Sequence, residues 1–259
     1  MHEKKQILYI TDSGFDTNNP TQHLQITVIK DLIKYGYKVH FVFSYERDPN
    51  YLPPELVGID GLTYTTIKHR KASKHNFVLR YLNGMLFSLI GARKIKRAQK
   101  QSCVTVLQSS ATAIFTMVIL RAISKKPVIY NEYDIFPGEI YDNGTLKSKF
   151  IYDVLQSIQN NIYRMSNRII TLTLDTKKTL LKIGVPNEKI EIIPTWYDIN
   201  SILPVSSDRN RFIEKYGIDK NKFIVQFAGT LGYVFDYHAV LQTAEALIDN
   251  RDIEFHMIW

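Results

Sequence analysis

A chain of 259 residues, 45% of them apolar, is long enough for one large domain or two smaller ones with a substantial core. Its single cysteine, Cys103, excludes an internal disulfide framework and favours a reducing compartment, and no run of about 20 apolar residues is available to span a membrane. The net charge of +8 favours an anionic partner such as a nucleotide, a nucleic acid or an acidic membrane, and composition does not choose among them.

The first elements of the chain alternate between strands and a helix. Short apolar runs predict three strands, at 6–10, 39–43 and 62–67. An apolar stripe at helical spacing lies between the first two, and this βαβ opening predicts a parallel sheet with helices on its faces. Asp12, Ser13 and Gly14 follow the first strand, at the edge where open α/β sheets place ligands. A turn or capping role also fits Asp12.

The segment after the third strand combines apolar and basic residues. Phe77–Ile90 predicts a helix that is apolar on nearly every side, and basic residues precede it at 68–74. The basic residues that follow it are Arg93, Lys94, Lys96, Arg97 and Lys100. This pattern suits a helix that lies in the surface of an anionic bilayer. A buried crossover helix with solvated basic ends fits the same pattern, so both interpretations stay open.

Four further strands continue the alternation, at 103–108, 127–130, 168–174 and 189–193. A long loop, NEYDIFPGEIYDNG, follows the second of them and contains Asp134 and Glu139, whose irregular spacing does not indicate a metal site. Asp175 is the predicted N-cap of a short helix, and Trp196 follows the last strand. The pattern predicts one doubly wound parallel α/β sheet of about seven strands over residues 1–200.

From residue 201 the composition changes. Residues 201–210 have a linker composition, and 222–247 predict a strand, a glycine turn and a helix. The turn, FAGTLG at 227–232, leaves backbone N–H groups open beside the positive end of a helix, which can hold a phosphate. A βα turn that needs glycine only for its dihedrals fits equally. We expect residues 201–259 to be a linker and the incomplete start of a second Rossmann-like domain.

Four segments carry a family resemblance: YNEYDIFPGE at 130–139, IITLTLDTKKTLLKIGVPNEKIEIIPTWYD at 169–198, FAGTLG at 227–232 and IEFHMIW at 253–259. In this order they resemble glycosyltransferases of the GT-B fold, in particular the family 4 sugar transferases of bacterial polysaccharide assembly. The first is similar to a cleft loop with the pattern Asp-x-x-Pro, the second to the run that leads to the hinge. The third is similar to the opening of the donor domain.

The resemblance implies a reaction in which a sugar moves from a nucleotide-sugar to a glycan or lipid-linked acceptor with retention of configuration. It implies no cofactor, no obligatory metal and no nucleic acid partner. The leaving nucleotide diphosphate would be held by backbone amides near Gly229, Thr230 and Gly232. Asp134 and Glu139 are the expected catalytic contacts to acceptor or sugar hydroxyls.

The expected acceptor side of the cleft comprises Asp12, Ser13, Gly14 and Trp196. The expected location is the cytoplasm, with peripheral membrane contact through Arg93, Lys94, Lys96 and Arg97.

The sequence also departs from the family pattern. The loop SGFDTNNPTQH has one glycine where many members have a pair, and Thr230 and Phe235 stand where many relatives carry Arg and Lys. The Glu-x7-Glu element that binds the donor in the family is absent from these 259 residues, so we expect this chain alone to be inactive as a transferase. Two other readings stay open: a non-catalytic partner subunit or truncated gene product of the same fold, and a nucleotide-sugar epimerase.

Overall fold

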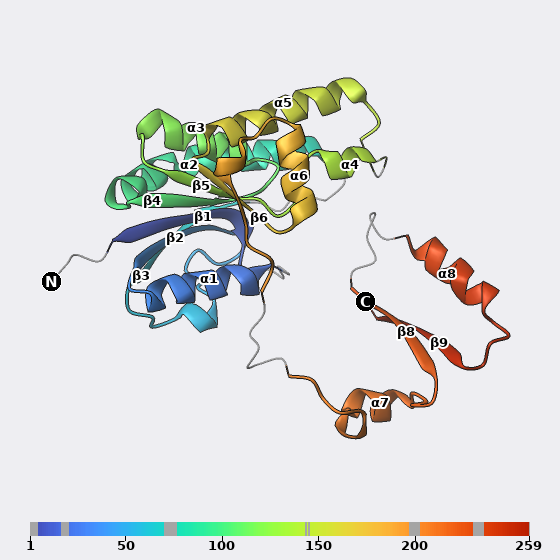
Figure 1. Cartoon of the computed structure of the whole chain (residues 1–259). Coiled ribbons are helices and arrows are strands. Elements are labelled where there is room, and N and C mark those ends of the chain that lie inside the picture. The colour runs from blue at the N-terminus through green and yellow to red at the C-terminus, as the bar shows by residue number, and fades with distance from the viewer. Residues whose placement is uncertain are drawn as a thin grey trace. The chain divides into compact units, whose positions relative to one another are not determined.

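The computed structural model describes residues 5–16, 21–69, 77–142, 144, 146–196, 203–229 and 236–258. The chain divides into two compact units, Met1–Trp196 and Tyr197–Trp259 (Figure 1). None of the helices in the described ranges is both long enough and apolar enough to cross a membrane.

The first unit is built on a seven-stranded sheet in the order β3-β2-β1-β4-β5-β6-β7. Every pair of neighbouring strands is parallel. The strands are β1 (Gln6–Gly14), β2 (Lys38–Tyr45), β3 (Leu62–Lys68), β4 (Val104–Gln108), β5 (Val128–Asn131), β6 (Arg168–Thr171) and β7 (Ile190–Ile192). The predicted doubly wound parallel sheet is confirmed.

Helices cover both faces of this sheet. They are α1 (Gln22–Lys34), α2 (Phe77–Gln101), α3 (Ala113–Ile123), α4 (Gly138–Asp142), α5 (Lys149–Met165) and α6 (Leu174–Lys182). Figure 1 shows α1 on one face and α2, α3 and α5 on the other. This division follows from chain direction, because right-handed crossovers that run in opposite directions along a sheet leave their helices on opposite faces.

Each face has its own buried core. On the α1 side, Phe41 stacks on Phe43 with ring centroids 4.6 Å apart, and Phe15 meets both edge-on. On the other side, side chains of α2, α3 and α5 join those of the strands, for example Phe87, Met117 and Ile162. Because both faces of the sheet are covered, the central strands consist of nearly continuous apolar residues.

Two local predictions need correction. The helix expected to end at Ile90 continues to Gln101, so the basic residues from Arg93 onward lie within it and not after it. The N-cap of α6 is Thr173 and not Asp175, because the Thr173 hydroxyl accepts a hydrogen bond from the Thr176 amide at 3.1 Å. Asp175 lies in the first turn, where the positive end of the helix dipole stabilises its negative charge.

The second unit contains a two-stranded parallel sheet. Its elements are α7 (Arg211–Tyr216), β8 (Phe223–Ala228), α8 (Tyr237–Ala246) and β9 (Ile253–Ile258). The strands pair in continuous register from Phe223 opposite Ile253 to Ala228 opposite Ile258. The helix α8 is N-capped by Asp236, whose carboxylate accepts from the Ala239 amide at 3.1 Å.

Candidate active site

The order of the strands marks one place in the first unit as a ligand site. From β1 the chain proceeds to β2 and β3 on one side, then returns to β4 on the other and continues away to β7. The carboxyl ends of β1 and β4 therefore flank the point where the order reverses. Open α/β sheets bind ligands in the crevice at such a point. Asp12, Ser13 and Gly14 lie there, at the end of β1.

Asp12 is held by hydroxyl groups from the neighbouring strand end. Its Oδ2 accepts hydrogen bonds from Ser110 Oγ at 2.7 Å and from Thr112 Oγ1 at 2.6 Å. Its backbone carbonyl accepts from Ser44 Oγ at 2.8 Å, at the end of β2. The segment after β4 thus fixes the half-buried carboxylate of Asp12 and the end of β2 fixes its backbone, which is more than a local turn would need.

The local backbone explains how Asp12 reaches these partners. The regular pairing of β1 with β2 is interrupted between Ile10 and Gly14, so the residues between them leave the ladder. Thr112 occupies the N-cap of α3, and the Asp12 carboxylate lies at the positive end of that helix, where negative charge is favoured. Sequence reasoning missed Ser110 and Thr112. The sequence feature that could have indicated them is the SSAT run after β4, because its hydroxyl groups lie near Asp12 once β4 pairs with β1.

Gly84 of α2 is packed directly against Thr112. A Cβ atom added to Gly84 would come within 2.3 Å of Thr112 Cβ and Oγ1, closer than any real contact. Glycine is therefore required for α2 to approach the loop that binds Asp12. This contact links α2 to the candidate site.

The loop after β5 lies one strand beyond β4 and is anchored by a buried polar network. Gln108 Nε2 donates to the Asn131 carbonyl at 3.2 Å, and Asn131 Nδ2 donates to Gln108 Oε1 at 2.9 Å. The buried Glu132 accepts from Gln159 Nε2 of α5 at 3.0 Å. Burial, together with the nearby charge of Glu132, raises the pKa of Tyr130 well above its usual value.

Asp134 projects from this anchored loop. It is an exposed residue, yet surrounding protein atoms partly desolvate its carboxylate and raise its pKa. The Tyr133 amide beside it donates to Ser109 Oγ at 3.1 Å, which ties the loop to the end of β4. Asp134 and Asp12 therefore belong to loops at the same edge of the sheet. Glu139 lies in α4, and its side chain is outside the described part of the structure.

Trp196 is not brought to this point by the strand order. It follows β7, and β4, β5 and β6 separate that strand from β1. At about 4.8 Å per strand, β7 lies roughly 19 Å from β1. The Trp196 ring is half-buried, and its indole N–H has no hydrogen-bond partner within the described ranges.

In the second unit, Gly229 directly follows β8, and its amide donates to the Ile258 carbonyl at 3.0 Å. That amide is therefore used in the sheet and is not open to a phosphate, in contrast to the expectation from the turn. Thr230 and Gly232 lie outside the described residues.

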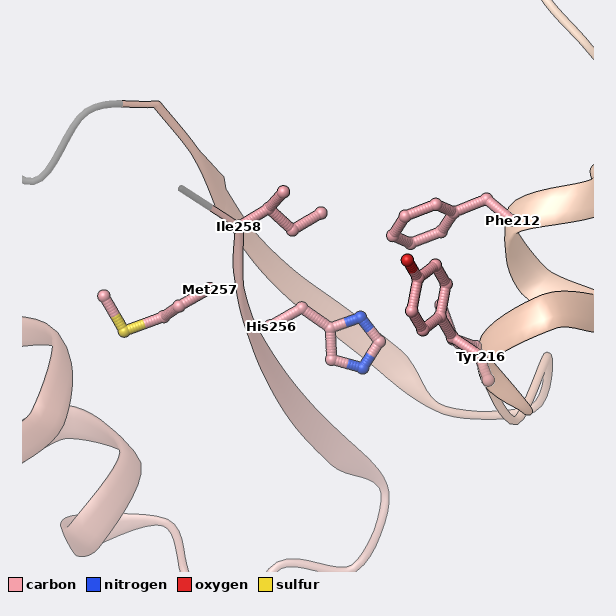
Figure 2. A pocket seen from close by; sticks show the side chains of 6 residues that line it. Phe212, Tyr216, His256, Met257 and Ile258 are labelled. Carbon is pink, nitrogen blue, oxygen red and sulfur yellow. The ribbon is translucent and has the colours of Figure 1, made fainter.

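The second unit also has an open pocket of about 430 Å³ between α7 and β9. Figure 2 shows the Phe212 and Tyr216 rings from α7 facing His256 and Ile258 of β9. Two of the lining side chains, Tyr216 and His256, carry polar groups, and His256 Nε2 already forms a hydrogen bond with Glu254 Oε1 at 2.8 Å. The pocket thus offers mainly aromatic and aliphatic contacts.

Across the described ranges, no group of three or more His, Cys, Asp or Glu residues is arranged to hold a metal ion.

Comparison with known proteins places the chain in a family. The family model for glycosyltransferase family 4 matches residues 26–201, about two thirds of the sequence. The chain belongs to glycosyltransferase family 4. The matched region of this family 4 protein includes β4, the β5 loop and α2, and it begins after Asp12. Among curated proteins, none matches the sequence.

Solved structures share the fold of this family 4 chain. HepE from Anabaena, crystallised with UDP and glucose, has a TM-score of 0.61 at 14% identity, covering 98% of this chain and 70% of HepE. A ugt transferase from Siraitia grosvenorii in complex with UDP has a TM-score of 0.59 at 9% identity, with coverage of 98% and 64%.

A putative UDP-N-acetylglucosamine 2-epimerase from Listeria monocytogenes is also similar, with a TM-score of 0.57 at 12% identity and coverage of 98% and 62%. The fold is therefore that of GT-B proteins, and it is shared by transferases and epimerases. The family 4 match, and not the fold, distinguishes a transferase.

Proposed function

We propose that this family 4 glycosyltransferase moves a sugar from a nucleotide-sugar to a glycan or lipid-linked acceptor in surface polysaccharide synthesis. The reaction takes place in the cytoplasm, retains the anomeric configuration and requires no metal. The observation that carries the proposal is the Asp12 carboxylate, fixed by Ser110 and Thr112 at the switch point of a family 4 sheet. UDP-containing neighbours of the same fold support a nucleotide-sugar as donor.

In this proposal Asp12 binds an acceptor hydroxyl. A carboxylate with one oxygen held by two hydroxyl donors keeps its other oxygen for a further donor, and a sugar hydroxyl supplies one. Asp134 projects from the anchored loop at the same edge and takes a second hydroxyl, with Glu139, in the helix α4 that follows this loop, as the further acid. Ser13 and Gly14, which follow Asp12 at the end of β1, complete the acceptor side.

The donor is assigned to the glycine turn of the second unit. Because the Gly229 amide is engaged by Ile258, the diphosphate contacts fall to the amides of Thr230 and Gly232. Donors that face the oxygens on which charge develops stabilise the departing nucleotide diphosphate.

The test is a transfer assay on the protein expressed from its complete reading frame. Labelled UDP-, GDP- and ADP-sugars are offered with membranes of the source cell as acceptor, and sugar transfer, nucleotide release and the anomeric proton of the product are measured. Asp12→Asn should reduce transfer about 100-fold or more, the size of effect usual for a positioned carboxylate.

Asp16→Asn is the matched control, because the Asp16 carboxylate binds the amides of residues 46–48 and not the switch-point hydroxyls. Unchanged transfer by Asp12→Asn would refute the site assignment. Interconversion of the donor to its epimer without transfer would refute the proposed reaction and favour the epimerase reading.

A further inference from the structure

The helix α2 has one face committed to the interior of the first unit. Gly84, Phe87, Gly91, Ile95 and Ala98 recur at intervals of three and four residues, and all are buried. Residues at this spacing share one side of a helix. The opposite side of α2 must therefore face away from the sheet.

The outward side begins with a row of aliphatic residues. Leu79, Leu82, Leu86, Leu89 and Ile90 are between 44% and 59% exposed. Their spacing places them on one stripe, opposite the buried row. A surface helix normally presents polar residues there, whereas Leu82, Leu86, Leu89 and Ile90 leave about half of their surface exposed.

Basic residues continue the same stripe toward the end of the helix. Arg93 is seven residues beyond Leu86, and Lys96, Arg97 and Lys100 follow at helical spacing. All four are exposed, and within the described ranges none of them forms an ion pair. Lys94 is different, because its Nζ donates to the Thr66 carbonyl at 3.2 Å. The outer face of α2, from Leu79 to Lys100, thus has an aliphatic half and a basic half along about 32 Å.

The net charge of the protein is concentrated around this helix. Residues 61–131 hold 13 of the 33 Lys and Arg residues and none of the 25 Asp and Glu residues. The rest of the chain has 20 basic and 25 acidic residues, a net charge of −5. Arg121 and Lys126 in this block are used internally, because they donate to carbonyls at the ends of α5 and α2. The charges on the outer face of α2 have no such internal use.

We propose that the outer face of α2 binds the surface of an anionic lipid bilayer. The aliphatic half would enter the boundary between headgroups and acyl chains, and Arg93, Lys96, Arg97 and Lys100 would contact anionic headgroups. A bilayer surface offers apolar and anionic partners side by side, which is the combination that this stripe requires. The membrane contact predicted from the sequence is therefore assigned to the outer face of α2.

Other occupants match only half of the stripe. In a parallel pairing of two copies the basic halves would repel each other, and in an antiparallel pairing each leucine half would meet a basic half. A nucleic acid would neutralise the basic half and leave the leucines in water. Of these three occupants, the bilayer is the one that satisfies both halves.

The contact between Gly84 and Thr112 connects this surface to the candidate active site. The inner face of α2 touches the residue that binds Asp12, while the outer face contacts lipid. A lipid-linked acceptor would then be delivered beside the switch-point carboxylate. Binding itself does not depend on the proposed transfer reaction, so the two proposals can fail separately.

Vesicle flotation with the full chain tests the proposal. The vesicles are phosphatidylcholine alone or phosphatidylcholine mixed with phosphatidylglycerol. Binding should require phosphatidylglycerol and weaken as NaCl is raised, because salt screens the headgroup potential. Arg93→Gln/Arg97→Gln should lower the vesicle partition coefficient about 25-fold, or about fivefold for each basic residue lost.

The matched charge control is Lys30→Gln/Lys34→Gln, a pair of exposed lysines with the same spacing on α1, on the other face of the sheet. It should bind vesicles like the unchanged protein. Leu86→Ser/Ile90→Ser should also lose binding, whereas Tyr35→Ser, which removes an exposed ring beside α1, should not.

A depth measurement separates insertion from simple charge attraction. Cys103 is the single cysteine, so Leu89→Cys in a Cys103→Ser background gives one site for an environment-sensitive dye. Its emission should shift to the blue on anionic vesicles alone. Equal binding to neutral vesicles, unchanged binding of the Arg93/Arg97 variant, or a soluble dimer abolished by the Leu86/Ile90 variant would overturn the proposal.

Discussion

The two units of the chain contain the same kind of element but differ in how their strands are covered. In the first unit helices lie on both faces of the sheet, and side chains such as Leu8, Tyr9 and Ile10 are completely buried. In the second unit no described residue is buried, and the inner positions of β8 and β9 stay half-exposed. Strand pairing is thus present in both, whereas a closed core is found in only one.

The difference shows that the strand–turn–helix pattern and a closed apolar core are separate properties of a sequence. Phe223–Ala228 is as apolar as the strands of the first unit, yet Phe223 remains 69% exposed. Two strands with two short helices cover too little surface to form a closed interior. The second unit should accordingly be the less stable part of this chain.

Hydrogen exchange should show the largest contrast. Amides of β1 such as those of Leu8 and Tyr9 should exchange at least about 1,000-fold more slowly than those of Phe255 and Met257 in β9, because buried strands open only by global unfolding. Exchange followed by mass spectrometry after proteolysis resolves the two strands. Similar protection in both would contradict the comparison between the units.

A pair of phenylalanine truncations sharpens the comparison. Phe41→Ala removes a fully buried ring that packs against Phe43 and Phe15, and should lower the free energy of unfolding by about 3–5 kcal/mol. Phe223→Ala, at an exposed strand position, should change it by less than about 0.5 kcal/mol. Urea denaturation followed by circular dichroism measures both variants. Equal losses of unfolding free energy would show that Phe223 also packs in a core, which would contradict the comparison between the units.

Gly84→Ala tests a close contact within the first unit. The added methyl group meets the stiff, β-branched Thr112 and should lower the free energy of unfolding by about 1–3 kcal/mol relative to Gly91→Ala. Gly91 is the matched control, because an added Cβ there meets the end of the Ile67 side chain, which can rotate away. Both variants gain the same helix propensity, so the difference between them reports the contact. Identical stabilities would mean that the Thr112 loop yields freely.

Asp16 should give the smallest effect and a defined pH dependence. Partial burial raises the pKa of this carboxyl, but backbone N–H donors of residues 46–48 outweigh it, and the pKa lies below its usual value. The stabilisation by Asp16 is therefore complete above the pKa of the unfolded chain and is lost as pH falls through the lower folded pKa. Asp16→Asn should cost about 1 kcal/mol at neutral pH.

Thermal denaturation of Asp16→Asn and the unchanged protein across the acid range checks this prediction. The two melting curves should converge on acidification. A difference that grows toward low pH would have the wrong sign for the proposed interaction.

Local patterns were sufficient for the strands but not for the site. The apolar runs and their spacing predicted the parallel sheet, because each run depends only on neighbouring residues. The bond from Ser110 to Asp12 spans 98 residues and exists because β4 lies beside β1, which no local pattern shows. The pattern of Phe77–Ile90 likewise left its inner face undefined. The small residues Gly84 and Gly91 marked that face, and the structure was needed to recognise it.

The close approach of α2 to Thr112 also sets how far an acceptor would travel. One helix diameter, about 10–12 Å, separates the leucines of the outer face from the hydroxyl that binds Asp12. If the outer face of α2 binds the bilayer as proposed, an acceptor anchored in that same bilayer surface would need to extend past a single helix to meet the carboxylate, while its lipid stays in the membrane. Lengthening the spacer between lipid and sugar should then bring little benefit, and the short path would select for acceptors whose reactive hydroxyl lies near the interface.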